Sequence, residues 1–70
     1  MFHERLVEIR KSQGITQKQV ADALGIKEQT YQRHEYGKNE LKELTIIKLC
    51  NYFNVSADYL LGLSDDPEKR

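Results

Sequence analysis

Four glycines divide this chain of 70 residues, and each follows a stretch whose apolar residues recur at helical spacing. They stand at positions 14, 25, 37 and 62. Glycine directly after such a stretch is a common end of a helix, because glycine adopts a positive φ without steric cost. The single proline, Pro67, lies near the end, so no proline breaks an earlier helix. The sequence therefore predicts an all-α domain of five short helices.

The spacing of apolar residues places these helices at about residues 2–12, 16–25, 28–36, 43–53 and 56–62. In the first helix, Phe2, Leu6 and Ile9 share one apolar face. The second helix is expected to begin with a capping box, in which Thr16 and Gln19 satisfy each other's backbone N–H groups.

Two helix starts have weaker signals. The third helix follows Lys27, which has no side-chain oxygen to cap it. The fourth helix is expected near Glu43, although Asn39 is a good capping residue and leaves an earlier start open. The short fifth helix is expected to be capped by Ser56.

Composition narrows the class of protein. A chain of 70 residues that is 39% hydrophobic and 31% charged is expected to form one small globular domain. Such a domain has little room for a deep substrate cleft, which favours a binding module over an enzyme. Cys50 is the single cysteine and cannot form an internal disulfide, which favours a reducing, cytoplasmic setting. No apolar run approaches the roughly 20 residues needed to span a bilayer, so no membrane partner is expected.

The residues that bind soft metals do not form a site in the sequence. His3, His34 and Cys50 are spaced unlike any zinc signature, and no glycine-rich phosphate loop is present. We therefore expect no metal, no cofactor, no catalytic group and no small-molecule site.

Residues 17–36 carry the pattern of two helices joined by a tight turn. Ala21 provides the small side chain that two steeply crossing helices need, and Gly25 provides the positive φ of the turn. Their spacing of four residues predicts a helix-turn-helix formed by the second and third helices.

Three further segments carry a family resemblance. They are Leu6-Val7-Glu8-Ile9-Arg10-Lys11-Ser12-Gln13-Gly14-Ile15-Thr16-Gln17, Arg33-His34-Glu35-Tyr36-Gly37-Lys38 and Phe53-Asn54-Val55-Ser56-Ala57-Asp58-Tyr59-Leu60-Leu61-Gly62. In order and spacing the chain resembles the lambda-repressor/Cro-like (XRE) family over about residues 4–67. This resemblance implies a compact five-helix DNA-binding domain over residues 1–63, of a bacterial or phage transcription regulator. We expect residues 64–70 to be a polar tail or the start of a linker.

The resemblance also implies that the outer face of the third helix reads bases in the major groove. A glutamine can pair with adenine through two hydrogen bonds, and arginine or lysine can reach guanine or a phosphate. A glutamate can accept from cytosine or exclude wrong sites. The same polar face is also compatible with simple solvation. The expected base-reading residues are Lys27, Glu28, Gln29, Gln32 and Arg33.

Phosphate contacts are expected around this helix. Gln17 lies in the first turn of the second helix, where free N–H groups and the helix dipole favour an anion, and the resemblance implies the same role. The other expected phosphate contacts are Arg10, Lys18, Lys38 and Asn39.

The resemblance implies an ion pair and a dimer contact as well, while Tyr31 and His34 depart from the residue types common in the family. Arg10 and Glu35 are expected to form an ion pair that ties the first helix to the third. Tyr31 and His34 are expected to be half-buried, with their polar ends reaching water. A weak homodimer is expected through the last helix and its flanks, with contacts from Tyr59, Leu60 and Leu63.

These features favour a sequence-specific regulator, most simply a repressor that binds double-stranded DNA as a dimer on a palindromic operator. The 11 basic and 11 acidic residues give no net charge, which argues against nucleic-acid binding. Residues 10–38, however, contain six of the basic residues and only three of the acidic residues. Two alternatives stay open: a protein-interaction adaptor without DNA binding, which Glu28 and the zero charge favour, and an antitoxin-type autoregulator.

Overall fold

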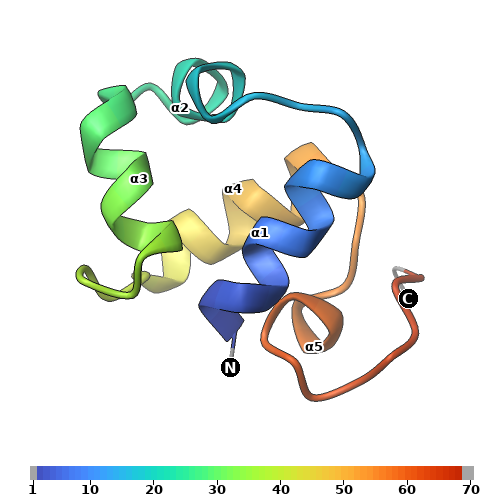
Figure 1. The fold of residues 1–70 in the computed structure, drawn as a ribbon. Coiled ribbons are helices and arrows are strands. Elements are labelled where there is room, and N and C mark those ends of the chain that lie inside the picture. The colour runs from blue at the N-terminus through green and yellow to red at the C-terminus, as the bar shows by residue number, and fades with distance from the viewer. Residues whose placement is uncertain (1, 69–70) are drawn as a thin grey trace.

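The computed structural model describes residues 2–68, with the backbone alone at Phe2. This part of the chain contains no strand and five helices: α1 (Phe2–Ser12), α2 (Gln17–Leu24), α3 (Glu28–Glu35), α4 (Glu43–Phe53) and α5 (Ala57–Leu60). Figure 1 shows α2 and α3 meeting at a steep angle, with α5 at the opposite end of the molecule. The predicted all-α, five-helix architecture with a helix-turn-helix is confirmed. The expected apolar role of the Phe2 side chain lies outside the described residues.

The start and end of α2 follow the predicted local chemistry. The Thr16 hydroxyl accepts from the backbone N–H of Gln19 at 3.1 Å, and the Thr16 N–H donates to the Gln19 side chain at 2.8 Å. Gly25 ends the helix with φ 72°, and Ile26 N–H donates back to the Ala21 carbonyl at 3.0 Å. These bonds turn the chain directly from α2 into α3.

The earlier start considered for α4, at Asn39, is wrong. The helix begins at Glu43, after Lys42 in an extended conformation with ψ 156°. The extended connection places Leu41 against the hydrophobic core. Burial of this leucine explains why the helix does not begin at the better capping residue.

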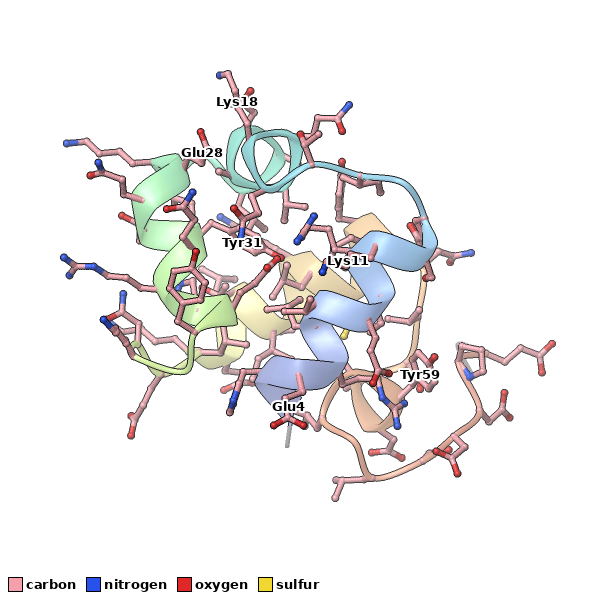
Figure 2. All side chains as sticks on the ribbon, viewed as in Figure 1. Glu4, Lys11, Lys18, Glu28, Tyr31 and Tyr59 are labelled. Carbon is pink, nitrogen blue, oxygen red and sulfur yellow. The ribbon has the colours of Figure 1, made fainter. Side chains whose placement is uncertain are left out.

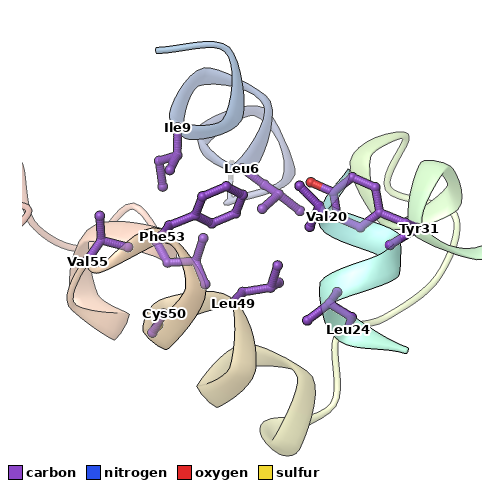
Figure 3. Packing of buried hydrophobic residues seen from close by; sticks show 11 residues of the cluster. Leu6, Ile9, Val20, Leu24, Tyr31, Leu49, Cys50, Phe53 and Val55 are labelled. Atoms are coloured by element: carbon purple, nitrogen blue, oxygen red, sulfur yellow. The ribbon is translucent and has the colours of Figure 1, made fainter. Parts of the chain in front are cut away.

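The core lies where α1, α2, α3 and α4 converge. Figure 3 shows Phe53 of α4 beside Leu6 and Ile9 of α1, with Leu49 next to it. All four side chains are at most 2% exposed. The remaining members of this buried cluster are Val20, Ala21, Leu24, Tyr31, Cys50, Val55 and Leu60.

Two residues of α3 are more deeply buried than predicted. Tyr31 is 0% exposed and His34 is 9% exposed, and the Tyr31 hydroxyl and His34 Nδ1 are both shielded from solvent. The reason is that α3 packs against both α1 and α2, which together cover its inner face. The Tyr31 hydroxyl and His34 Nδ1 find no hydrogen-bond partner of regular geometry in the described part of the chain.

The C-terminal segment folds back onto the domain. Arg5 donates to the carbonyl oxygens of Tyr59 and Ser64, at 3.1 and 3.2 Å, and its guanidinium lies 4.3 Å from the centre of the Tyr59 ring. The Ser56 N–H donates to the Pro67 carbonyl at 3.0 Å. Residues 64–68 therefore have more contacts than their polar composition indicates, and residues 69–70 lie outside the described residues.

Candidate nucleic-acid interface

The outer face of α3 is polar and open to solvent. Lys27, Glu28, Gln29 and Arg33 are exposed, and Gln32 is half-buried. No side chain caps this helix, as predicted, because Lys27 makes no capping hydrogen bond. The structure thus brings all five predicted base-reading residues onto or beside one exposed helix face. Figure 2 shows Glu28 at the start of α3, at the same end of the molecule as Lys18 of α2.

A buried ion pair supports α3 from behind. Arg10 of α1 donates from Nε to Glu35 Oε2 at 2.6 Å and from Nη2 to Glu35 Oε1 at 3.2 Å. The two side chains are only 12% and 2% exposed. A third nitrogen of Arg10 donates to the Ile15 carbonyl at 3.0 Å. The ion pair implied by the resemblance is confirmed, and its geometry favours a structural role for Arg10 over the expected phosphate contact.

The neighbours of Glu35 keep it charged. Burial by itself raises the pKa of this carboxyl, but hydrogen bonds from Arg10 and Gln17 and the nearby hydroxyl of Tyr31 outweigh burial and hold the pKa below its usual value. Burial, followed by the nearby carboxylate, raises the pKa of Tyr31. The hydrogen bond to Glu35 raises the pKa of Arg10. Glu35 is therefore the acceptor at the centre of a small buried polar cluster.

This cluster extends to the polar outer face of α3 through two glutamines. Gln17 Nε2 donates to Glu35 Oε1 at 3.0 Å. The other end of the Gln17 amide accepts from Gln32 Nε2 at 3.2 Å. The sequence indicated separate roles for Gln17 and Gln32, at a phosphate and at a base. Their direct contact depends on the angle between α2 and α3, which no sequence pattern specifies.

The remaining predicted phosphate residues lie on both sides of α3. Lys18 is exposed on α2, where it pairs with Asp22 at 3.5 Å on the surface. Lys38 and Asn39 follow α3 and line a shallow hollow, beside His34 at the end of that helix. Lys18 and Lys38 are exposed and Asn39 is half-buried. Both sides of α3 therefore carry groups able to meet a phosphate.

Tyr36 is a candidate that the sequence analysis missed. It is 62% exposed and directly follows the last residue of α3. Positions 29, 33 and 36 share one helical face, so Tyr36 continues the face of Gln29 and Arg33. This helical spacing is the sequence signal that could have identified Tyr36.

The expected dimer contact needs one correction. Leu60 is 0% exposed and belongs to the core of the monomer, so it is not part of the surface. It is buried because α5 packs against both α1 and α4. Tyr59 is half-buried beneath Arg5, and Leu63 is 75% exposed.

The described part of the chain offers neither a membrane span nor a metal site. Within residues 2–68, no helix is long and apolar enough to cross a membrane. The described side chains also contain no cluster of three or more His, Cys, Asp or Glu suited to a metal ion.

Known proteins are similar to this chain in sequence and in fold. A family model described as helix-turn-helix matches residues 6–60. The SPbeta prophage-derived uncharacterized HTH-type transcriptional regulator YonR of Bacillus subtilis (strain 168) is 48% identical over 61 residues, which cover 87% of this chain and 56% of that protein. The chain spans 52–62% of the length of the curated relatives that it matches.

Two solved structures are similar as well. A transcriptional regulator from Listeria innocua superimposes with a TM-score of 0.82 at 29% identity, covering 89% of this chain and 58% of its own. The restriction-modification controller protein C.AhdI from Aeromonas hydrophila gives a TM-score of 0.79 at 25% identity, covering 84% of this chain and 89% of its own. These relatives come from a non-enzymatic family of regulators, which confirms that the chain is not an enzyme. The chain belongs to the lambda-repressor/Cro-like (XRE) family of helix-turn-helix proteins.

Proposed function

We propose that this chain is the DNA-binding domain of a cytoplasmic transcriptional repressor, which binds a palindromic operator as a weak homodimer. One observation carries the proposal. The polar face of α3 is open to solvent, while the opposite face is fixed to α1 and α2 by burial of Tyr31 and by the Arg10–Glu35 pair. A rigid helix with an exposed polar face is the element that this architecture inserts into the major groove.

In this proposal the base contacts come from α3. Gln29 and Gln32 read adenine, Lys27 and Arg33 reach guanine or an adjoining phosphate, and Glu28 accepts from cytosine. The Glu28 contact also disfavours other sequences. A carboxylate opposite a base other than cytosine meets hydrogen-bond acceptors or phosphates, which repel it.

Phosphate contacts place the helix in the groove. We assign them to Gln17, Lys18, Lys38 and Asn39, on the two sides of α3. Tyr36 is added to this set because its exposed phenol continues the reading face and has an O–H that can donate to a phosphate oxygen.

The dimer contact is proposed around the C-terminal end of α5. Leu63 is the most exposed large apolar side chain of the described residues, at 75%, and Tyr59 lies half-buried nearby. A single apolar residue with a half-buried neighbour supports only a weak contact, so DNA is expected to bring two copies together.

Selection of bound sequences from a random DNA pool tests the proposal. We expect enrichment of a palindrome whose half-sites lie about one helical turn apart. Binding to that sequence is expected to weaken with salt, with a log–log slope of about −2 per domain from Lys18 and Lys38, or about −4 where Lys27 and Arg33 also reach phosphates. The variant Arg33→Ala, which removes an exposed side chain of the reading face, is expected to bind more weakly while keeping the thermal stability of the wild type.

A protein-interaction adaptor remains the second candidate. Glu28 stands exposed on the reading face, and the chain has no net charge. Absence of any enriched sequence, together with no measurable binding at low salt, would support the adaptor and contradict the proposed repressor.

A further inference from the structure

One arginine side chain spans the connection between α5 and the C-terminal segment. Arg5 Nη1 donates to the carbonyl oxygens of Tyr59 and Ser64, at 3.1 and 3.2 Å. Its Nη2 donates to the Asp65 carboxylate at 3.3 Å, and its guanidinium lies 4.3 Å from the centre of the Tyr59 ring. The Arg5 side chain is only 17% exposed. A single group of α1 therefore holds both ends of residues 59–65.

Leu63 lies on this fixed connection. Its backbone N–H donates to the Asp58 carbonyl at 2.8 Å. The segment that follows is held as well, because the Ser56 N–H donates to the Pro67 carbonyl at 3.0 Å. The Leu63 side chain nevertheless remains 75% exposed. An exposed apolar side chain on a fixed turn is already in place for a partner, whereas one on a free tail must first be ordered.

Arginine suits this position better than lysine. Its planar fork presents several N–H donors in fixed directions, so one side chain reaches two carbonyls and a carboxylate while its face stacks on an aromatic ring. Lysine has the same charge but presents it at one point. The arrangement of residues 59–65 thus depends on the shape of the guanidinium as well as on its charge.

Arg5 lies apart from the proposed DNA contacts. Its partners belong to α1, to α5 and to the C-terminal segment, and Figure 1 shows α5 at the end of the molecule opposite α2. The carboxylates of Glu8 and Asp65 lie 3.7 and 3.3 Å from its guanidinium and offset its charge. A change at Arg5 is therefore expected to leave the polar face of α3 intact.

We propose that Arg5 is a positioning residue for self-association, which holds residues 59–65 so that Leu63 meets a second copy of this chain. The inference rests on the proposed function, because it concerns the proposed dimer contact. A twofold contact repeats the same surface on both copies, so a single exposed leucine supplies both halves of an apolar contact. Fixing the turn before association removes the cost of ordering it in the dimer.

Binding to the full palindrome and to a single half-site, measured by fluorescence anisotropy, tests this role. Half-site binding reports on α3 and its phosphate contacts, whereas cooperative binding to the palindrome also reports on contact between two copies. Arg5→Lys keeps the positive charge without the planar fork, and Arg5→Gln removes the charge. The control is Glu8→Gln, which removes an exposed neighbour of Arg5 and keeps the bonds to residues 59–65.

The expected result is a loss confined to the palindrome. In both Arg5 variants the affinity for the palindrome falls about fivefold or more, while half-site affinity stays within about twofold of wild type. Glu8→Gln changes neither affinity by more than about twofold. Leu63→Ser loses the same cooperativity, and adding Arg5→Lys to it causes no further loss, because both changes act on one contact.

Two results would overturn the positioning role. One is equal weakening of both complexes by Arg5→Lys, and the other is additive losses in the double variant with Leu63→Ser. Far-UV circular dichroism checks that each variant is folded. If neither Arg5 variant is folded, Asp65→Ala repeats the comparison, because its side chain is fully exposed. A smaller loss of cooperativity is then expected, and unchanged cooperativity would overturn the role.

Failure of the proposed function has a different appearance. A wild type that binds no selected sequence would overturn DNA reading, and one that binds the palindrome without cooperativity would overturn the dimer. Unchanged cooperativity in Leu63→Ser would move the dimer contact away from Leu63 and overturn this inference with it, while DNA reading would stand.

Discussion

Replacing Glu35 by alanine removes an acceptor on which several buried groups depend. Arg10 makes two hydrogen bonds to this carboxylate and Gln17 makes a third. The Tyr31 hydroxyl lies nearby and has no other partner in the described residues. Arg10 cannot move freely into solvent, because it is 12% exposed and is also bound to the Ile15 carbonyl. The variant therefore leaves a positive charge and two polar groups inside the domain.

The loss of stability is expected to be large for a chain of this size. Removing one partner of a buried ion pair costs about 3–5 kcal/mol, and partial access of water to Arg10 favours the lower value. Small domains are stable by roughly 0.05–0.15 kcal/mol per residue, which is about 4–10 kcal/mol for this chain. A loss of about 3 kcal/mol thus removes about a third or more of the stability and lowers Tm by about 12 °C or more.

Urea unfolding followed by far-UV circular dichroism measures this loss. The control is Asp22→Ala, whose carboxylate pairs with Lys18 on the surface, where the two side chains are 68% and 70% exposed. Removing that pair is expected to cost less than about 0.5 kcal/mol. Equal unfolding midpoints for Glu35→Ala and Asp22→Ala would refute the reasoning.

A double variant distinguishes the cost of an unpaired buried charge from the cost of lost packing. Arg10→Met with Glu35→Leu removes both charges, so no buried charge remains unpaired. We expect it to be more stable than Glu35→Ala by at least about 1 kcal/mol. A double variant that is less stable than Glu35→Ala would show that packing, rather than the unpaired charge, sets the cost.

Further predictions concern pH, the loop after α3, DNA and assembly. Because the pKa of Glu35 is lower in the folded state than in the unfolded chain, its stabilising effect is complete above the ordinary glutamate pKa and is lost as the pH falls through the folded-state pKa. The difference in urea midpoint between wild type and Glu35→Gln is therefore expected to shrink from pH 6 to pH 3. Gly37→Ala is expected to lower Tm more than Gly14→Ala, because both positions have φ near +70° but only Gly37 has a histidine ring 3.3 Å from the place of a new Cβ; equal losses would contradict this contact. Tyr36→Ala is expected to weaken operator binding roughly 10-fold with unchanged Tm, and Tyr36→Phe to do the same if the hydroxyl is the contact, as anisotropy titrations can show. Leu63→Ser is expected to lower the dimer fraction in sedimentation equilibrium without lowering Tm, and an unchanged dimer fraction would place the dimer contact elsewhere.

The helices and their order were predictable because their signals are local. The capping box of Thr16 and Gln19 and the positive φ of Gly25 each involve a few consecutive residues. Apolar spacing found the buried faces of α1, α2 and α4, since helical periodicity alone determines which side chains share a face. The Arg10–Glu35 pair needed the family resemblance, because 25 residues separate its members.

The features that the sequence did not predict depend on the packing of one helix against another. Periodicity placed Tyr31 and His34 on the inner face of α3, but the depth of burial follows from how α1 and α2 close over that face. The contact between Gln17 and Gln32 likewise joins two helices across the tight turn. The sequence left two starts open for α4, near Glu43 and at Asn39, because capping preference competes with packing of Leu41 against the core; the helix begins at Glu43.

The zero net charge of the chain does not describe the local charge around α3, because two of the nearby acidic residues are paired. Glu35 is buried and paired with Arg10, and Asp22 is paired with Lys18. Of the three acids among residues 10–38, Glu28 alone remains an exposed carboxylate without such an ion pair in the described structure. A local field depends on the position of each charge, whereas net charge averages over the whole surface.

The field at the proposed reading face is therefore more positive than the composition indicates, yet it stays modest. Lys27, Arg33 and Lys38 lie there with two exposed carboxylates, those of Glu28 and Glu40, which implies weak binding to arbitrary DNA. Under the proposed function, affinity therefore comes from base contacts and from two copies bound to one operator. Under the same proposal, sequence specificity comes from polar side chains of α3 such as Gln29 and Gln32, whose hydrogen bonds distinguish one base edge from another, whereas a phosphate contact is the same on every sequence.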